Sequence, residues 1–177
     1  IGQTDAERKT VTRAQIVKSP QYKLARAKAD VFFDTARDFF DVADFHVYST
    51  RPEEIGACAT WMLQQMSKRG YTKLLDCCEA ASPFFDWTEE RFAECVVKMT
   101  IIGISAGCRK VLWSSLLPTA GWSLNYLRTA LIDTNESDTA AFHTYGMMTE
   151  KLADIESISE FEGRPQNTAA YLAKTPA

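Results

Sequence analysis

The chain has 177 residues, 46% of them hydrophobic, and its 20 basic and 23 acidic residues give a net charge of −3 at neutral pH. This composition excludes a wholly disordered chain, and the acidic balance disfavours a general nucleic-acid binder, which needs a basic face. The chain holds only 8 glycines and 6 prolines. Because tight turns consume these residues, their scarcity favours helices over strands.

The N-terminal stretch, residues 1–18, is predicted to be an arm or a helix. The chain begins with Ile1 instead of Met, which fits a removed organelle-targeting peptide. No stretch reaches the roughly 18 apolar residues that a membrane span needs. We therefore expect no membrane span.

The first regular pattern runs from Tyr22 to Ala43, with apolar residues at alternating spacings of three and four. This spacing predicts one continuous amphipathic helix. Four acidic residues follow one side of it, with Arg37 between them: Asp34, Asp38, Asp41 and Asp44. Because no Glu-x-x-His accompanies them, we interpret this group as a solvated or partner-facing edge.

Further helices are predicted along the rest of the chain. Thr50-Arg51-Pro52-Glu53 fits a capping box, and Gly70 fits a left-handed helix end. The pattern then predicts a short helix over 72–81, helices that begin near residues 88, 105 and 123, and one over 138–152. Residues 157–165 are predicted to be a loop, and 168–173 a short helix or docking tail. The total is roughly seven to eight helices.

An internal repeat organises these elements. Pro83 and Pro118 are 35 residues apart, and Trp87 and Trp122 have the same spacing. A helical hairpin of this length must stack on its neighbours to bury its apolar face. The predicted fold class is therefore all-α, a short array of helical hairpins over 19–153, followed by a C-terminal tail over 154–177.

A 35-residue helical unit with a proline before the next first helix resembles the pentatricopeptide repeat, over residues 50–153. Most pentatricopeptide proteins read single-stranded RNA with polar residues of each first helix. The candidate reading positions here are Gly56, Arg91 and Tyr126 or, one residue on, Ala57, Phe92 and Leu127. Neither register gives a consistent polar code, which disfavours RNA as a partner.

A small, acidic array without an RNA code resembles the pentatricopeptide-like helical-repeat subunit of the mitochondrial ATP synthase of euglenozoan protists. The resemblance implies a location in the mitochondrial matrix and docking on the α subunit of the catalytic head. It also implies a structural, non-catalytic role in a complex for proton transport and ATP synthesis. Two alternatives remain open, an organellar RNA-binding pentatricopeptide-type protein and a small helical enzyme.

The sequence shows no catalytic, cofactor or metal motif. His46 and His143 are isolated, so a catalytic dyad would have to form in three dimensions. Aromatic residues near the two prolines are interpreted as packing between repeats or, alternatively, as partner contacts: Phe84, Phe85, Trp87 and Trp122.

The five cysteines are odd in number and form no C-x-x-C motif. We expect them to be reduced and mostly buried in the core.

Overall fold

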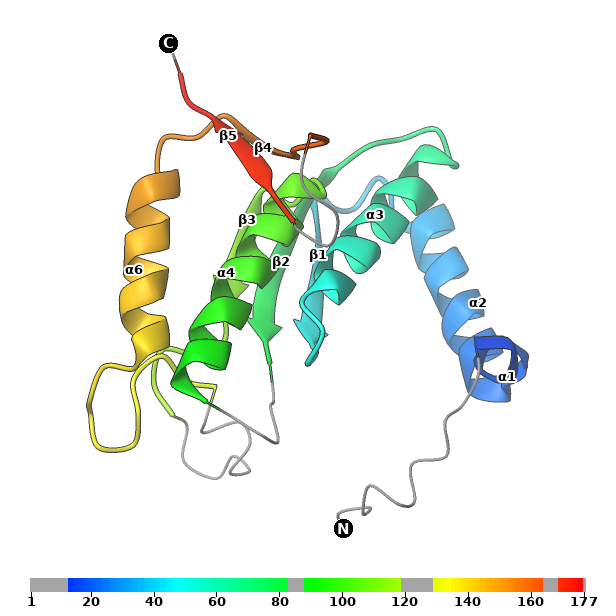
Figure 1. Ribbon diagram of the computed structural model, residues 1–177. Coiled ribbons are helices and arrows are strands. Elements are labelled where there is room, and N and C mark those ends of the chain that lie inside the picture. The colour runs from blue at the N-terminus through cyan, green and yellow to red at the C-terminus, as the bar shows by residue number, and fades with distance from the viewer. Residues whose placement is uncertain (1–12, 83–87, 119–128, 164–168, 177) are drawn as a thin grey trace. The chain divides into compact units, whose positions relative to one another are not determined.

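The computed structural model describes residues 13–82, 88–118, 129–163 and 169–176. The chain divides into two compact units, Ile1–Phe40 and Asp41–Ala177. Figure 1 shows the elements in chain order. Among the described residues there are five helices and five strands, so the expected all-α repeat array is wrong and the chain is of the α/β class.

The first unit contains helices α1 (Arg13–Lys18) and α2 (Pro20–Thr35). The hydroxyl of Ser19 caps α2 by accepting the backbone N–H of Tyr22 at 3.2 Å, and Pro20 is tolerated in the first turn. The helix ends at Thr35, and strand β1 begins at Val42. The predicted continuous helix over 22–43 is therefore wrong in its last turns.

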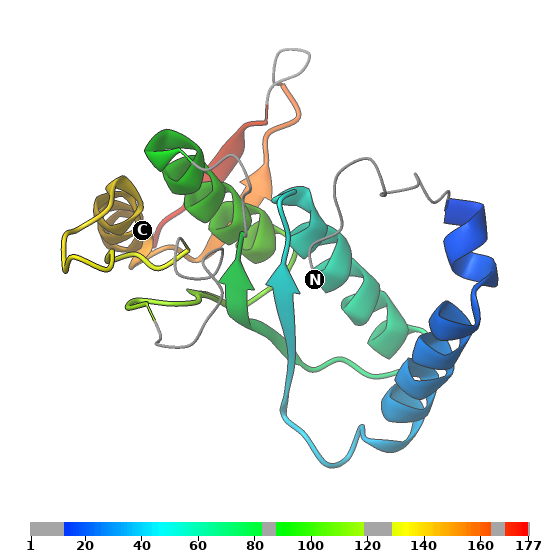
Figure 2. The ribbon, with the colours of Figure 1, turned by 90° about the horizontal axis from the view of Figure 1, so that it is seen from below.

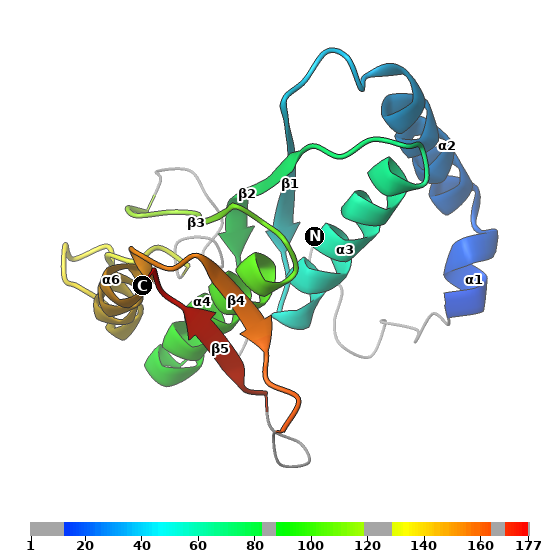
Figure 3. The same ribbon diagram turned by 90° about the horizontal axis from the view of Figure 1, so that it is seen from above.

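The second unit is built on a parallel sheet of three strands, in the order β1-β2-β3. Strand β1 (Val42–Tyr48) leads into helix α3 (Glu53–Ser67), and β2 (Leu74–Ala81) leads into α4 (Glu89–Ser105) and then β3 (Lys110–Trp113). Because crossovers between parallel strands are right-handed and the strand order never reverses, both helices must cover one face of the sheet. Figures 2 and 3 show α3 and α4 on the same side of β1 and β2.

Two segments expected to be helical are strands of this sheet, the predicted helix over 72–81 and part of the one that begins near 105. A short apolar run bounded by turn residues cannot be told from a buried helix segment by periodicity alone. The short length of β2 and the Val-Leu-Trp run of β3 favour the strand.

The core lies between the sheet and the two helices. Ile55 and Met66 of α3 and Phe92 and Met99 of α4 are fully buried, each worth about 1.5–3 kcal/mol relative to exposure. The strands contribute the residues that alternate toward the helices: Ala43, Val47, Leu75, Cys77, Ala80, Val111 and Trp113. The opposite face of the sheet carries polar side chains together with the exposed Leu74 and Leu112.

The chain continues with α6 (Ala140–Leu152), which packs beside α4, and a hairpin of β4 (Ser157–Glu160) and β5 (Tyr171–Lys174). The hairpin is antiparallel, and β4 packs on α4. The predicted loop over 157–165 and the predicted short helix over 168–173 are therefore wrong, since each contains a strand.

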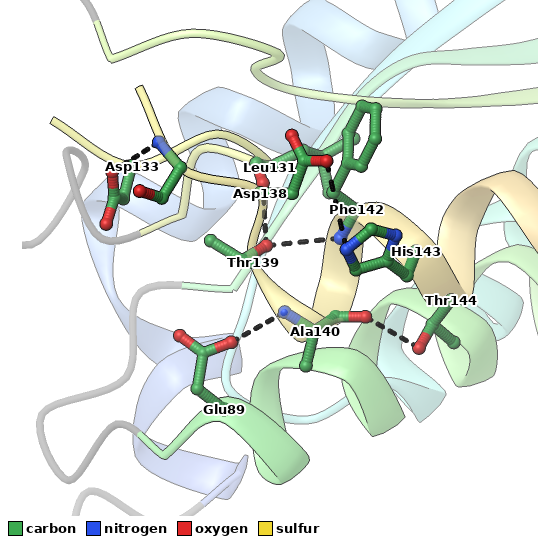
Figure 4. A network of polar contacts seen from close by, with 10 residues as sticks. Glu89, Leu131, Asp133, Asp138, Thr139, Ala140, Phe142, His143 and Thr144 are labelled. Carbon is green, nitrogen blue, oxygen red and sulfur yellow. Dashed lines mark hydrogen bonds and ion pairs between the residues drawn. The ribbon is translucent and has the colours of Figure 1, made fainter. Parts of the chain in front are cut away.

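The start of α6 is held by a polar network (Figure 4). Thr139 accepts the backbone N–H of Phe142 at 3.1 Å and donates its hydroxyl to the carbonyl of Leu131 at 2.6 Å. The carboxylate of Glu89, in the first turn of α4, accepts the backbone N–H of Ala140 at 2.7 Å. Glu89 therefore ties the beginnings of the two helices together.

None of the helices in the described part of the chain is long and apolar enough to cross a membrane.

Candidate functional site

Strand β1 presents a row of polar side chains on the face of the sheet that the helices leave open. Asp44, His46 and Tyr48 are exposed, while Ala43 and Val47 of the same strand are buried. Side chains of a strand alternate between its two faces, so the three polar groups share one face. This period of two was present in the sequence, but the helical stripe from Tyr22 to Ala43 obscured it.

Glu79 of β2 joins this row. The hydroxyl of Tyr48 donates a hydrogen bond to Oε2 of Glu79, and Nδ1 of His46 lies 3.4 Å from the same oxygen. In the described part of the chain, Oε1 of Glu79 has no hydrogen-bond or ion-pair partner. One carboxylate oxygen is thus held, and the other is open to a ligand.

Asp44 completes the group. Its Oδ2 lies 3.2 Å from Nε2 of His46, so the imidazole bridges two carboxylates. The side chains of Asp44, His46 and Glu79 are 39%, 46% and 42% exposed, so a molecule in solution can reach them.

The position of the group in the fold is significant. His46, Tyr48 and Glu79 lie toward the carboxyl ends of two adjacent parallel strands. In barrels of alternating strands and helices and in open α/β sheets, ligands bind at this end of the strands. The group is therefore placed where this type of sheet carries its functional site.

A second charged pair on β2 has a structural role. Asp76 is buried, and the guanidinium of Arg109 contacts both of its carboxylate oxygens, Nε at 3.1 Å and Nη2 at 2.6 Å. The hydrogen bonds that the guanidinium donates to Asp76 raise the pKa of Arg109. Because both oxygens of Asp76 are occupied, this pair compensates a buried charge and leaves no group free for chemistry.

The structure does not test the four predicted partner contacts. Phe84, Phe85, Trp87 and Trp122 lie outside the described residues, so the expected partner contacts are not described by the structure.

His143 lies on α6, 3.8 Å from Asp138, while His46 lies on β1 beside Glu79. The four acidic residues do not share one helix, since Asp34 is on α2 and Asp44 is on β1. Sequence reasoning missed Glu79 and Tyr48 entirely.

Among the described residues, no group of three or more His, Cys, Asp or Glu side chains is arranged to bind a metal ion. The carboxylate, imidazole and phenol of the site are groups that bind and orient polar molecules by hydrogen bonds. A free carboxylate oxygen can also act as a nucleophile or a base.

Comparisons with known proteins agree with the α/β architecture. No protein-family model matches the chain, and no curated protein matches it. A similar solved structure is a GH128 (subgroup VI) exo-beta-1,3-glucanase from Aureobasidium namibiae, with a TM-score of 0.51 and 13% sequence identity. The match covers 68% of this chain and 47% of that one, so it involves about half the length of the glucanase.

This likeness concerns the fold alone. The expected resemblance to a pentatricopeptide-like subunit of ATP synthase is wrong, because the chain has a parallel sheet with a glycosidase-like fold neighbour where a helical-repeat array was expected. The keywords that followed from it, helical repeat, mitochondrion and ATP synthase, lose their basis with the repeat.

Proposed function

We propose that the chain carries a carboxylate site that hydrolyses glycosidic bonds of a β-linked glucan, with Glu79 as the catalytic carboxylate. The observation that carries the proposal is the state of Glu79, whose Oε2 accepts a hydrogen bond from Tyr48 and lies 3.4 Å from Nδ1 of His46, while Oε1 is open. The fold likeness to an exo-beta-1,3-glucanase supports the choice of glucan as substrate class. The proposal departs from the expected non-catalytic role, from the expected docking on a protein partner and from the alternative of RNA binding, none of which an observation tests.

The chemistry requires two carboxyl groups. In the retaining reaction, Oε1 of Glu79 attacks the anomeric carbon and the bond to the leaving oxygen breaks with its electron pair. A second carboxylic acid gives a proton to that oxygen, and water later hydrolyses the glycosyl ester. The hydrogen bond from Tyr48 holds the nucleophile in one orientation, so that little rotamer freedom is lost on reaching the transition state.

Asp44 does not fit the role of the second acid, because its two oxygens face the backbone N–H of Cys78 and the imidazole of His46. The proton donor is therefore assigned to a group outside this cluster. A substrate whose leaving group needs no proton therefore tests Glu79 independently of the proton donor. In an aryl glycoside with a good leaving group, the phenolate departs without being protonated.

The first experiment measures release of dinitrophenolate from 2,4-dinitrophenyl β-glucoside by the full chain. Glu79→Gln keeps the size and hydrogen bonding of the side chain but removes its negative charge, and we expect a loss of about 100-fold or more in kcat. Glu156→Gln, in the loop before β4, is the matched control and should retain the wild-type rate. Equal rates for wild type and Glu79→Gln would overturn the proposal.

A second experiment does not depend on turnover. A 2-deoxy-2-fluoro β-glucosyl fluoride should form a stable ester with the nucleophile, and peptide mass spectrometry should place the label on Glu79. Binding of β-1,3-glucan oligosaccharides without ester formation or hydrolysis would point to a carbohydrate-binding role and contradict the hydrolytic one.

A further inference from the structure

Strands β1 and β2 pair through a β-bulge beside the site. Opposite residues are Asp44 with Asp76 and Phe45 with Cys77, but His46 lies opposite Glu79. Cys78 is therefore an extra residue on β2. A bulge of this kind leaves a residue unpaired in the ladder and redirects the side chains that follow it.

The bulge decides which face Glu79 occupies. Since side chains alternate along a strand, a regular register would place Cys78 opposite His46 and turn Glu79 toward the helix-covered face. With the extra residue, Glu79 shares the open face with His46 and Tyr48. The position of the catalytic carboxylate thus depends on the bulge being kept.

Asp44 stabilises the bulge and the imidazole at the same time. Its Oδ1 accepts the backbone N–H of Cys78 at 2.9 Å, and its Oδ2 faces Nε2 of His46 at 3.2 Å. A charge-assisted bond to the bulged N–H is stronger than a neutral one, and a partner on Nε2 fixes the tilt of the ring. The other ring nitrogen of His46 is then directed at Oε2 of Glu79.

We propose that Asp44 is the positioning residue of this site, acting on Glu79 through the backbone of Cys78 and through the ring of His46. The inference rests on the proposed function of Glu79, because it concerns the same carboxylate. Asp44 itself touches no reacting atom. Its removal should lower kcat more than it changes KM, since a displaced nucleophile affects the transition state and not the initial binding.

Two substitutions in the full chain separate the two routes. Asp44→Asn keeps an oxygen that accepts the N–H of Cys78 but loses the charge beside His46, whereas Asp44→Ala loses both contacts. With 2,4-dinitrophenyl β-glucoside we expect kcat to fall about tenfold in Asp44→Asn and about 100-fold in Asp44→Ala, with KM within about twofold of wild type. Asp41→Ala, which removes the same charge just before β1, is the control.

Two readouts are independent of activity. Amide hydrogen exchange at Cys78 should stay slow in Asp44→Asn and become at least about tenfold faster in Asp44→Ala. The nitrogen-15 chemical shifts of the His46 ring should change in both variants and stay at wild-type values in Asp41→Ala. Unchanged exchange and unchanged ring shifts in Asp44→Ala would overturn the inference. An inactive wild-type chain with these changes present would instead refute the proposed function and leave Asp44 as the organiser of the bulge.

Discussion

At the scale of single residues, burial decides which of the five thiols can react. Burial raises the pKa of Cys77 to about 12, of Cys95 to about 11 and of Cys108 to about 12. The thiolate is the reactive form of cysteine, and with these raised pKa values almost no thiolate of the three buried residues exists at pH 8. Cys58 and Cys78 are exposed, although their pKa values are also raised, by partial desolvation of the sulfur for Cys58 and by a hydrogen bond with Asp44 for Cys78.

We therefore expect iodoacetamide at pH 8 to label Cys58 and Cys78 in the folded protein, and the three buried cysteines only in denaturant. Peptide mass spectrometry of the alkylated protein gives the extent at each position. The adjacent pair Cys77 and Cys78 provides an internal comparison, since the two differ in burial and not in sequence context. Equal labelling rates at these two positions would contradict the strand assignment of β2.

Tyr48 gives a second prediction at this scale. Tyr48→Phe removes the hydroxyl that donates to Oε2 of Glu79 and keeps the ring. The carboxylate then loses one of its two contacts, so we expect kcat for the aryl glucoside to fall about tenfold. Both side chains are partly exposed, so the free energy of unfolding should change by no more than about 1 kcal/mol.

The control for this prediction is Tyr145→Phe on α6, whose hydroxyl makes no contact with Glu79. The rate is measured by dinitrophenolate release and the stability by urea denaturation. A rate loss of equal size in the two variants would show that the effect does not pass through Glu79.

The site could be predicted from the sequence only in part. The sequence shows His46 as an isolated titratable residue and Asp44 as one of four spaced acids, which the apolar pattern assigns to the side of a helix. Their meeting with Glu79 depends on the pairing of β1 with β2 and on one extra residue at Cys78. Register between strands more than 30 residues apart is a tertiary property, which local periodicity does not contain.

At the scale of elements, the start of α6 has a cap from outside its own helix. The carboxylate of Glu89 accepts the backbone N–H of Ala140, while Thr139 supplies the usual hydroxyl cap (Figure 4). An anion at a helix N-terminus is favourable because the first N–H groups have no partner within the helix. Glu89→Ala should therefore lower the free energy of unfolding by about 1 kcal/mol.

Urea denaturation of matched variants checks this prediction. Glu89→Gln keeps an acceptor for the N–H and should recover about half of the loss, since the dipole interaction needs the charge. Glu90→Ala changes the neighbouring, exposed residue of the same turn and should be nearly neutral. Equal losses for Glu89→Ala and Glu90→Ala would mean that the link between the two helices contributes nothing.

The long helices were predictable because local signals and packing agree there. The helices at Glu53–Ser67, Glu89–Ser105 and Ala140–Leu152 confirm the predicted ones, and Gly70 has the expected left-handed conformation with a φ of 75°. The Thr50 capping box was wrong, since Pro52 is the N-cap of α3 and no side chain caps it. Strand β3 was missed because four residues give no usable period.

At the scale of the whole molecule, the 35-residue period in the sequence predicts a helical hairpin, but the repeating unit is a strand followed by a helix. Helices α3 and α4 begin at Glu53 and Glu89, and strands β2 and β3 begin at Leu74 and Lys110, so both spacings are 36 residues. This is close to the 35 residues between Pro83 and Pro118. A strand followed by a helix and two loops has the same length as a helical hairpin, so a period alone does not identify the fold.

The meeting of three elements at Gly103 offers a test of the α/β packing as a whole. A Cβ atom at Gly103 of α4 would lie 2.7 Å from Cγ2 of Val111 on β3 and 3.0 Å from Cδ1 of Ile55 on α3. Both neighbours are buried and β-branched, so they have little freedom to move away. In a helical hairpin array, Val111 would lie on a helix and this three-way contact would not be required.

Gly103→Ala should therefore destabilise the protein. Overpacking costs about 1–3 kcal/mol, while alanine in a helix gains about 1 kcal/mol over glycine, so we expect a net loss of about 1 kcal/mol in urea denaturation. Gly146→Ala is the matched control, because a Cβ at that position of α6 meets no atom within 4 Å. The control should gain about 0.5–1 kcal/mol from helix propensity. The two substitutions should therefore change the free energy of unfolding in opposite directions, because only α4 is packed tightly between β3 and α3 at this position. Stabilisation by both substitutions would contradict that arrangement.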